Sequence, residues 1–211
     1  MHLQLTELEA DIKKLKSFAR RADKIEHKRT VLLPKWLPIA QEHINEINET
    51  QPNTSDNPIF AYCIIWLFDS GDLGTAIDHA FTAIKHGQPM PNIIRRQWPG
   101  FIADTVYDWA EQQAEQGNSI QPYFGRVFEH VKTVWKLPEQ VTSKFYKFAG
   151  YALLRSTNGE ITPSHIGNLK QLREADALLA KAAELHKHAG VKTARNKIAM
   201  RIRALTELNA Q

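Results

Sequence analysis

The densest group of acidic side chains in this sequence is Asp69, Asp72 and Asp78. A metal-dependent nuclease needs two or three converging carboxylates, because they hold Mg²⁺ against a phosphate and help to activate a water molecule. Asp69 and Asp72 instead flank a tight turn, where Asp is favoured as the cap of the following helix. Glu26 stands two residues before a lysine, but within a charged helical segment. We therefore expect neither catalytic nor metal-binding residues, and a nuclease that uses Asp69, Asp72 or Glu26 is kept as an alternative.

Other patterns of catalysis are also missing from the sequence. No Gly-rich segment ends in Gly-Lys-Ser/Thr, so an ATPase phosphate loop has no candidate and we expect no cofactor. The single cysteine, Cys63, lies in the apolar run Ile59–Phe68 and is expected to be a buried thiol. His186 and His188 stand two apart on an expected helix, a spacing that turns the rings to different sides and disfavours a metal site.

Positive charge is concentrated in two segments, although the formal net charge of the whole chain is only +4. Residues 13–29 contain eight Lys or Arg against two acids, and residues 181–203 contain seven against one. The 151 residues between these segments hold twelve basic and sixteen acidic side chains. A polyanion is therefore expected to meet the two basic segments.

The first basic segment predicts a helix with two different faces, from about Leu5 to Leu33. At 3.6 residues per turn, one face gathers a narrow apolar stripe that we expect to pack against sister chains. The stripe consists of Leu5, Leu8, Ile12, Leu15, Ala19 and Ala22. The opposite arc carries the cations that we expect to contact DNA phosphates: Lys13, Lys14, Lys16, Arg20, Arg21, Lys24 and Lys28.

The second basic segment supplies a second-choice set of DNA contacts. Its members are Lys192, Arg195, Lys197, Arg201 and Arg203. These cations flank an apolar line on the last helix rather than opposing it. The same pattern would arise if the aliphatic parts of these Lys and Arg side chains covered a hydrophobic core beside the apolar line.

The spacing of apolar residues predicts an all-α protein in which packed helical hairpins, loosely like tetratricopeptide units, follow the first helix. Pro34 and Pro38 are expected to end that helix and to change the direction of the chain. We expect four segments: a basic amphipathic helix at 1–33 for assembly and DNA contact, a short helix and linker at 34–57, a helical-hairpin domain at 58–189, and a basic helix at 190–211.

Composition fits a packed protein outside the secretory route. Hydrophobic residues make up 43% of the 211, and the longest apolar run is far too short to span a bilayer. The N-terminal segment lacks the apolar core of a signal peptide, and one cysteine permits no disulfide within the chain. We expect no membrane association.

Several segments together resemble the small terminase subunit of temperate tailed phages that cut packaged DNA at cohesive ends, the GpM-type family. The likeness spans about residues 15–205, and the order and spacing of its segments carry it. These segments are Leu32–Pro38, Trp66–Asp72 continuing through Ala76, Ala80 and Ala83 to Lys85–Gly87, Met90-Pro91, Leu137–Glu139 and Gly190–Lys192.

The resemblance implies a role in viral DNA packaging in the host cytoplasm. In this family the small subunit recognises the packaging site on double-stranded phage DNA and loads a large subunit that carries the ATPase motor. Small subunits of this kind generally form homo-oligomeric rings. The family is often labelled an endonuclease subunit, but we expect the cutting residues to lie in the large subunit. Relatives can carry a long basic tail after the last helix, and we expect this chain to be without one.

A third interpretation is a protein-binding helical adaptor whose hairpins form a docking groove. In that case the basic segments would serve only as solvated surface.

Overall fold

A computed structural model describes residues 2–51 and 55–208 and confirms the all-α class. Within these ranges the regular secondary structure is helical, apart from one isolated β-bridge between Arg155 and Ile161, and there is no β-strand. It forms two compact units, residues 1–102 and 103–211. No helix among the described residues is both long and apolar enough to cross a membrane.

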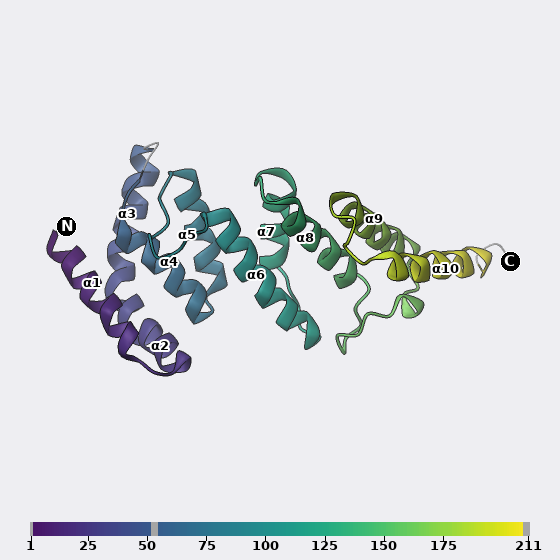
Figure 1. The fold of residues 1–211 in the computed structure, drawn as a ribbon, viewed down its shortest axis with the longest axis horizontal. Coiled ribbons are helices and arrows are strands. Elements are labelled where there is room, and N and C mark those ends of the chain that lie inside the picture. Colours follow the sequence, from purple (N-terminus) through teal and green to yellow (C-terminus); the bar gives the residue numbers. More distant parts are fainter. Residues whose placement is uncertain (1, 52–54, 209–211) are drawn as a thin grey trace. The chain divides into compact units, whose positions relative to one another are not determined.

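The first unit is built around α4 (Pro58–Ser70), whose side chains from Ile59 to Phe68 are buried apart from the half-buried Tyr62. α3 (Leu33–Thr50) and α5 (Leu73–Lys85) both pack against α4 (Figure 1). The Asn57 side chain caps the start of α4 by accepting a hydrogen bond from the Phe60 N–H, and Gly71 ends it in the left-handed region at φ 86°. α4 and α5 therefore form one of the helical hairpins that were expected to follow the first helix.

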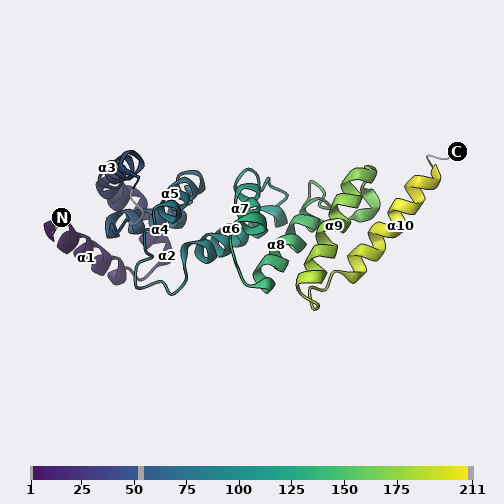
Figure 2. The same cartoon turned by 90° about the horizontal axis from the view of Figure 1, so that it is seen from above.

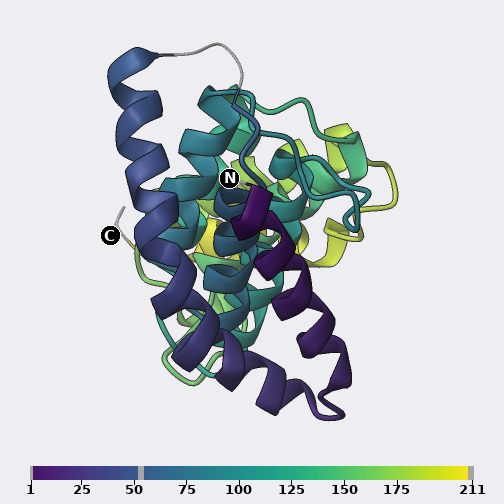
Figure 3. The ribbon, with the colours of Figure 1, turned by 90° about the vertical axis from the view of Figure 1, so that its left-hand side faces the viewer.

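The expected single helix from Leu5 to Leu33 is wrong, because the chain bends at residues 18–20. α1 (His2–Ser17) ends there, Arg20 has extended backbone angles, and α2 (Arg21–His27) begins in a new direction. Figure 3 shows α1 running down to the bend and α3 running back beside it. The bend lets α1 pack on its own chain, and these tertiary contacts override the helical preference of the local sequence.

The two prolines also act differently from the expectation. A widened π-helical turn, η1 (Lys28–Leu32), leads directly into α3, and Pro34 occupies its first turn, where a missing N–H costs little. Pro38 lies inside α3, which begins at Leu33 and continues to Thr50. The helix therefore does not begin at Pro38. The prolines therefore do not separate two helices, and the change of direction comes earlier, at residues 18–20.

The second unit contains α7 (Tyr123–Thr133), α8 (Glu139–Ala152), α9 (Leu169–Leu185) and α10 (Lys192–Leu208). α6 (Trp98–Glu115) contributes residues to both units. Figure 2 shows α8, α9 and α10 following one another as neighbours, and α9 packs against both others. A short 3₁₀ turn, η2 (Pro163–His165), contacts α10. Packed helices therefore continue through this unit, as the expected all-α class requires.

The two units divide the chain at residue 102, inside the expected 58–189 segment. The four expected segments describe functions rather than packing. The functional division therefore stays a prediction.

Candidate nucleic-acid interface

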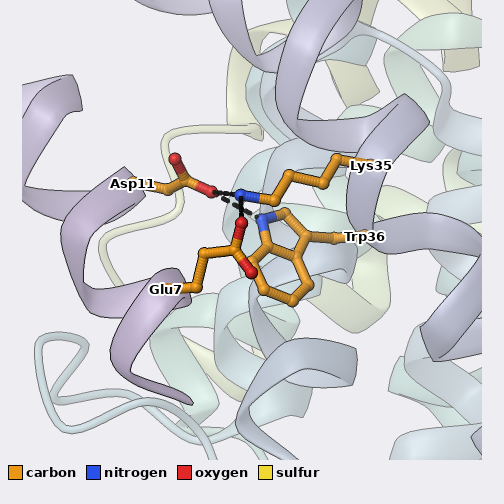
Figure 4. Close-up of polar contacts among 4 residues, drawn as sticks. All are labelled: Glu7, Asp11, Lys35 and Trp36. Carbon is orange, nitrogen blue, oxygen red and sulfur yellow. Dashed lines mark hydrogen bonds and ion pairs between the residues drawn. The ribbon is translucent and has the colours of Figure 1, made fainter. Parts of the chain in front are cut away.

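Polar contacts among Glu7, Asp11, Lys35 and Trp36 fix α1 to α3 in the first unit (Figure 4), and we call this cluster the anchor. The Lys35 ammonium lies 2.7 Å from the carboxylates of both Glu7 and Asp11. The indole N–H of Trp36, whose side chain is buried, donates to the same Asp11 oxygen at 2.9 Å. Although partial burial opposes it, the hydrogen bonds to Asp11 and Glu7 raise the pKa of Lys35. Two of the three acids of α1 are thus occupied within the protein, and the third, Glu9, is exposed.

The anchor leaves the cations of α1 and of the bend outside. Lys13, Lys14, Lys16, Arg20 and Arg21 are exposed, and Lys24 is half-buried. None of these six forms an ion pair with a carboxylate among residues 2–51 and 55–208. Lys14 and Lys16 also lie in the last turn of α1, where the helix dipole favours positive charge. We name these six side chains the bend cations.

Lys28, the seventh member of the predicted N-terminal set, is not a free cation. Its ammonium lies 2.5 Å from the Asp69 carboxylate, and its side chain is only 16% exposed. Lys28 begins the widened turn η1, which places it against the end of α4. Its charge is therefore engaged within the chain, and its assignment as a DNA contact stays a prediction.

The acids considered for a nuclease have structural contacts. Asp69 pairs with Lys28, Asp72 caps α5 by accepting a hydrogen bond from the Thr75 N–H, and Glu26 lies 3.5 Å from Arg29. No group of three or more His, Cys, Asp or Glu that could hold a metal ion occurs in the part of the chain that the structure describes. These contacts account for the three acids without catalysis.

The apolar stripe is largely covered by its own chain. Leu8 and Leu15 are 2% and 9% exposed, Leu5 and Ile12 are half-buried, and Ala19 and Ala22 are exposed. The stripe therefore does not lie open along its length, and the role of its residues in packing against sister chains stays a prediction. Leu8 and Leu15 are buried within their own chain, where α1 packs against α4.

The C-terminal cations divide into tied and free side chains. Arg195 forms two hydrogen bonds with the Asp176 carboxylate, at 2.7 and 3.1 Å, and Arg201 donates to the Ile166 carbonyl oxygen at 2.9 Å. Lys192, Lys197 and Arg203 are exposed. Arg195 and Arg201 thus help to position α10, and the assignment of all five cations as DNA contacts stays a prediction.

Lys192 and Arg195 line a cavity of about 420 Å³ at the connection between α9 and α10. Lys187 and Asn196 lie in the same wall. The cavity is therefore cationic apart from Asp176, which Arg195 already engages.

His186 and His188 do not lie on a helix, because α9 ends at Leu185 and both follow it. Their rings are 5.7 Å apart, so the argument that a helix turns them to different sides does not apply. Cys63 is fully buried, as expected, and burial raises its thiol pKa to about 12.

Sequence reasoning missed the anchor, although its signal was present. Lys35 and Trp36 lie in the segment Leu32–Pro38, one of the segments that carry the family resemblance. Glu7 and Asp11 are four residues apart, which places both on one face of a helix. An acidic pair on one helix and a Lys-Trp pair on another are complementary, but nothing in the sequence shows that the two helices meet.

The structure is that of an all-α protein with unpaired cations near a bend in its N-terminal unit. The chain belongs to the phage small terminase subunit family, whose family model matches residues 5–140. Membership gives it a role in viral DNA packaging.

Two named relatives agree with this family. One is 38% identical over 200 residues, 95% of this chain and 69% of the relative, and is named "Probable terminase, endonuclease subunit" of Haemophilus phage HP1 (strain HP1c1). The other is 27% identical over 168 residues, 80% of this chain and 66% of the relative, and is named "Terminase, endonuclease subunit" of Escherichia phage P2. The chain therefore spans about two thirds of the length of each relative. No solved structure gives a significant match.

Proposed function

We propose that this chain binds double-stranded phage DNA through the bend cations, assembles with copies of itself into a ring, and loads the large terminase subunit in the host cytoplasm. One observation carries the DNA contact. Lys35 engages Glu7 and Asp11, whereas the bend cations have no ion pair with a carboxylate of the described chain. Their charge is therefore available to an external polyanion.

Nucleic-acid phosphates suit this arrangement because binding releases counterions condensed on the duplex. The logarithm of affinity should fall with the logarithm of salt concentration, with a slope of about −0.9 for each phosphate contacted. Such contacts position a duplex without reading its sequence. Recognition of a particular packaging site then requires base contacts or DNA bending in addition.

A charge-neutralised variant tests the surface directly. Lys13→Gln, Lys14→Gln, Lys16→Gln and Arg20→Gln, made together, should lower affinity for a DNA fragment at about 0.1 M salt by at least about tenfold. The salt slope should become shallower by up to about 3.6. Filter retention at several salt concentrations measures both values, and circular dichroism checks that the helices are intact.

The matched control removes the same charge elsewhere. Lys85→Gln, Lys136→Gln, Lys170→Gln and Arg173→Gln replace four cations that are also exposed. DNA binding by this control should stay close to that of the unmodified chain. Equal losses in the two variants would mean that net charge, rather than the bend, governs binding.

The names of the two relatives favour a second candidate function, an endonuclease subunit. The purified chain would be incubated with packaging-site DNA and Mg²⁺ or Mn²⁺, beside an Asp69→Ala variant. We expect no cleavage by either protein, because Asp69 and Asp72 already serve the fold. Cleavage that disappears in Asp69→Ala would establish the nuclease.

If DNA retention on the filter is absent or does not change with salt concentration, the result would instead favour a protein-binding adaptor. Pull-down of the purified large subunit by the chain, with and without DNA, then tests the loading step. Capture that needs no DNA would identify a direct subunit contact.

A further inference from the structure

The bend between α1 and α2 lies in sequence that favours a continuous helix. Residues 17–20 are Ser-Phe-Ala-Arg, without the Gly or Pro that commonly ends helices. The apolar stripe also continues across the bend in phase, through Ala19 and Ala22. Arg20, which precedes α2 with extended backbone angles, provides no side-chain cap for it. Local sequence therefore does not impose the bend.

The contacts that impose it come from α1, which is held by a small and well-defined set of groups. These include the Glu7 and Asp11 contacts with Lys35, the Asp11 contact with Trp36, and the burial of Leu8 and Leu15. Across the bend itself, the Phe18 ring lies 5.0 Å from the His27 ring. α2, by contrast, buries none of its residues. Straightening the bend would thus free α1 while disturbing few other core contacts of the first unit.

We propose that α1 exchanges between copies of this chain, so that the α1 of one protomer occupies the α3–α4 surface of another. Each exchanged α1 makes the same ion pairs, indole hydrogen bond and leucine contacts that it makes within one chain. Residues 18–20 become helical, so α1 and α2 join into the helix that their sequence favours. The occupant is a second copy of this chain.

Charge complementarity identifies the occupant. The surface that receives α1 presents the Lys35 ammonium and the Trp36 N–H, and the matching partners are two carboxylates four residues apart on a helix. α1 supplies that pair together with the leucines that cover the rest of the surface. Short hinges of this kind are a recognised route to domain exchange. The exchange deepens the assembly step of the proposed function and rests on it.

Complementary charge variants test the exchange. The first variant, Lys35→Glu, repels its own Glu7 and Asp11. The second, Glu7→Lys with Asp11→Asn, repels its own Lys35 but keeps an amide oxygen for the Trp36 N–H. Within a single chain both anchors are broken, whereas between the two variants both anchors are restored.

Each variant alone should lose most of the oligomer seen for the unmodified chain, whose protomer mass is 24.1 kDa. Mixing them should give a species of at least twice that mass that contains both variants in equal amounts, measured by native mass spectrometry. If mixing produces no mixed species while the unmodified chain remains oligomeric, assembly does not use exchange and the proposal is overturned. A monomeric unmodified chain at all concentrations also overturns it.

A control separates misfolding from failed exchange. The variant with Glu7→Lys, Asp11→Asn and Lys35→Glu together restores opposite charges in every copy, so it should recover helix content and native mass. A second test inserts Gly-Gly after Ala19, because a longer hinge favours docking within one chain. This variant should remain monomeric at concentrations where the unmodified chain is oligomeric, and an unchanged oligomer would contradict exchange.

DNA retention distinguishes failure of the exchange from failure of the proposed function. The Gly-Gly variant keeps all the bend cations, so a monomer should still bind a short duplex with the same salt slope per protomer. Loss of oligomers with retained DNA binding supports exchange. An oligomer that persists without DNA binding overturns the proposed DNA contact and leaves assembly by another surface.

Discussion

Asp11 is the residue on which the position of α1 depends most. Its carboxylate accepts from both the Lys35 ammonium and the indole N–H of the buried Trp36. Asp11→Ala should therefore lower the free energy of unfolding by about 1 to 3 kcal/mol, because a buried donor loses its acceptor. Urea unfolding followed by circular dichroism measures the change.

Glu7→Ala is the matched control, since Glu7 touches only the ammonium and its side chain is 58% exposed. An exposed ion pair contributes less than about 1 kcal/mol. Equal losses in the free energy of unfolding for Asp11→Ala and Glu7→Ala would contradict a special role for the Asp11 contact with the Trp36 indole.

Cys63 should be chemically silent in the folded protein. The thiolate is the reactive form, and burial raises the pKa of this thiol to about 12. A thiol reagent such as dithionitrobenzoate should release no colour at pH 8 until denaturant is added. Stoichiometric reaction of the folded chain within minutes would mean that the first unit opens readily.

At the scale of elements, α8 and α9 approach each other closely at Gly150. A Cβ built there would lie 2.9 Å from two carbons of Leu179 and 3.1 Å from the Ala175 carbonyl oxygen. Gly150→Ala should therefore destabilise the chain by about 1 to 3 kcal/mol, despite the better helix propensity of alanine.

Gly100→Ala provides the comparison, because Gly100 lies in α6 and a Cβ added there would meet no other group within 4 Å. There the helix propensity acts alone, and stability should rise by up to about 1 kcal/mol. Thermal unfolding of the two variants should therefore shift in opposite directions.

Acid should weaken the first unit through histidines on α3 and α5. Burial lowers the pKa of His43 and of His79, although nearby Glu46 acts against the shift at His43 and Asp78 at His79. A lowered folded pKa means that the unfolded chain takes up protons first, so stability falls as the pH drops through about 6.5.

The melting temperature should accordingly fall between pH 7 and pH 5.5, and His79→Gln should reduce that fall. His165→Gln, at an exposed histidine of η2, serves as the control. A pH dependence that is unchanged in His79→Gln would exclude this histidine as a cause.

Sequence patterns predicted those elements whose signals are local. Asp69 and Asp72 were expected to flank a tight turn, and Asp72 caps α5, the helix that follows it. The bend at residues 18–20 has no local signal, because it depends on the meeting of Asp11 with Lys35 and Trp36. The pairing of Lys28 with Asp69 was missed for the same reason, since 41 residues separate the partners.

At the scale of the whole molecule, the sequence located the two basic segments but not which of their charges are free. The fold ties Lys28, Arg195 and Arg201 and leaves the bend cations in one unit and Lys192, Lys197 and Arg203 in the other. This distinction needs the partners, which come from distant residues such as Asp69 and Asp176.

Both free sets should contribute to DNA affinity if both meet the duplex. Lys192→Gln, Lys197→Gln and Arg203→Gln together should make the salt slope shallower by up to about 2.7. Combined with the bend substitutions, the two reductions should add, and retention at several salt concentrations tests this. A slope unaffected by the C-terminal substitutions would restrict DNA contact to the bend.

The widened turn η1 sets the directions in which the side chains of the following helix, α3, point. A π turn accommodates one residue more than an α turn, and each residue in an α-helix advances the direction of its side chain by about 100°. Removal of a single residue such as Thr30 would let a regular helix form and rotate Lys35 and Trp36 by that angle, away from α1. The length of this five-residue turn therefore determines which side of α3 faces α1.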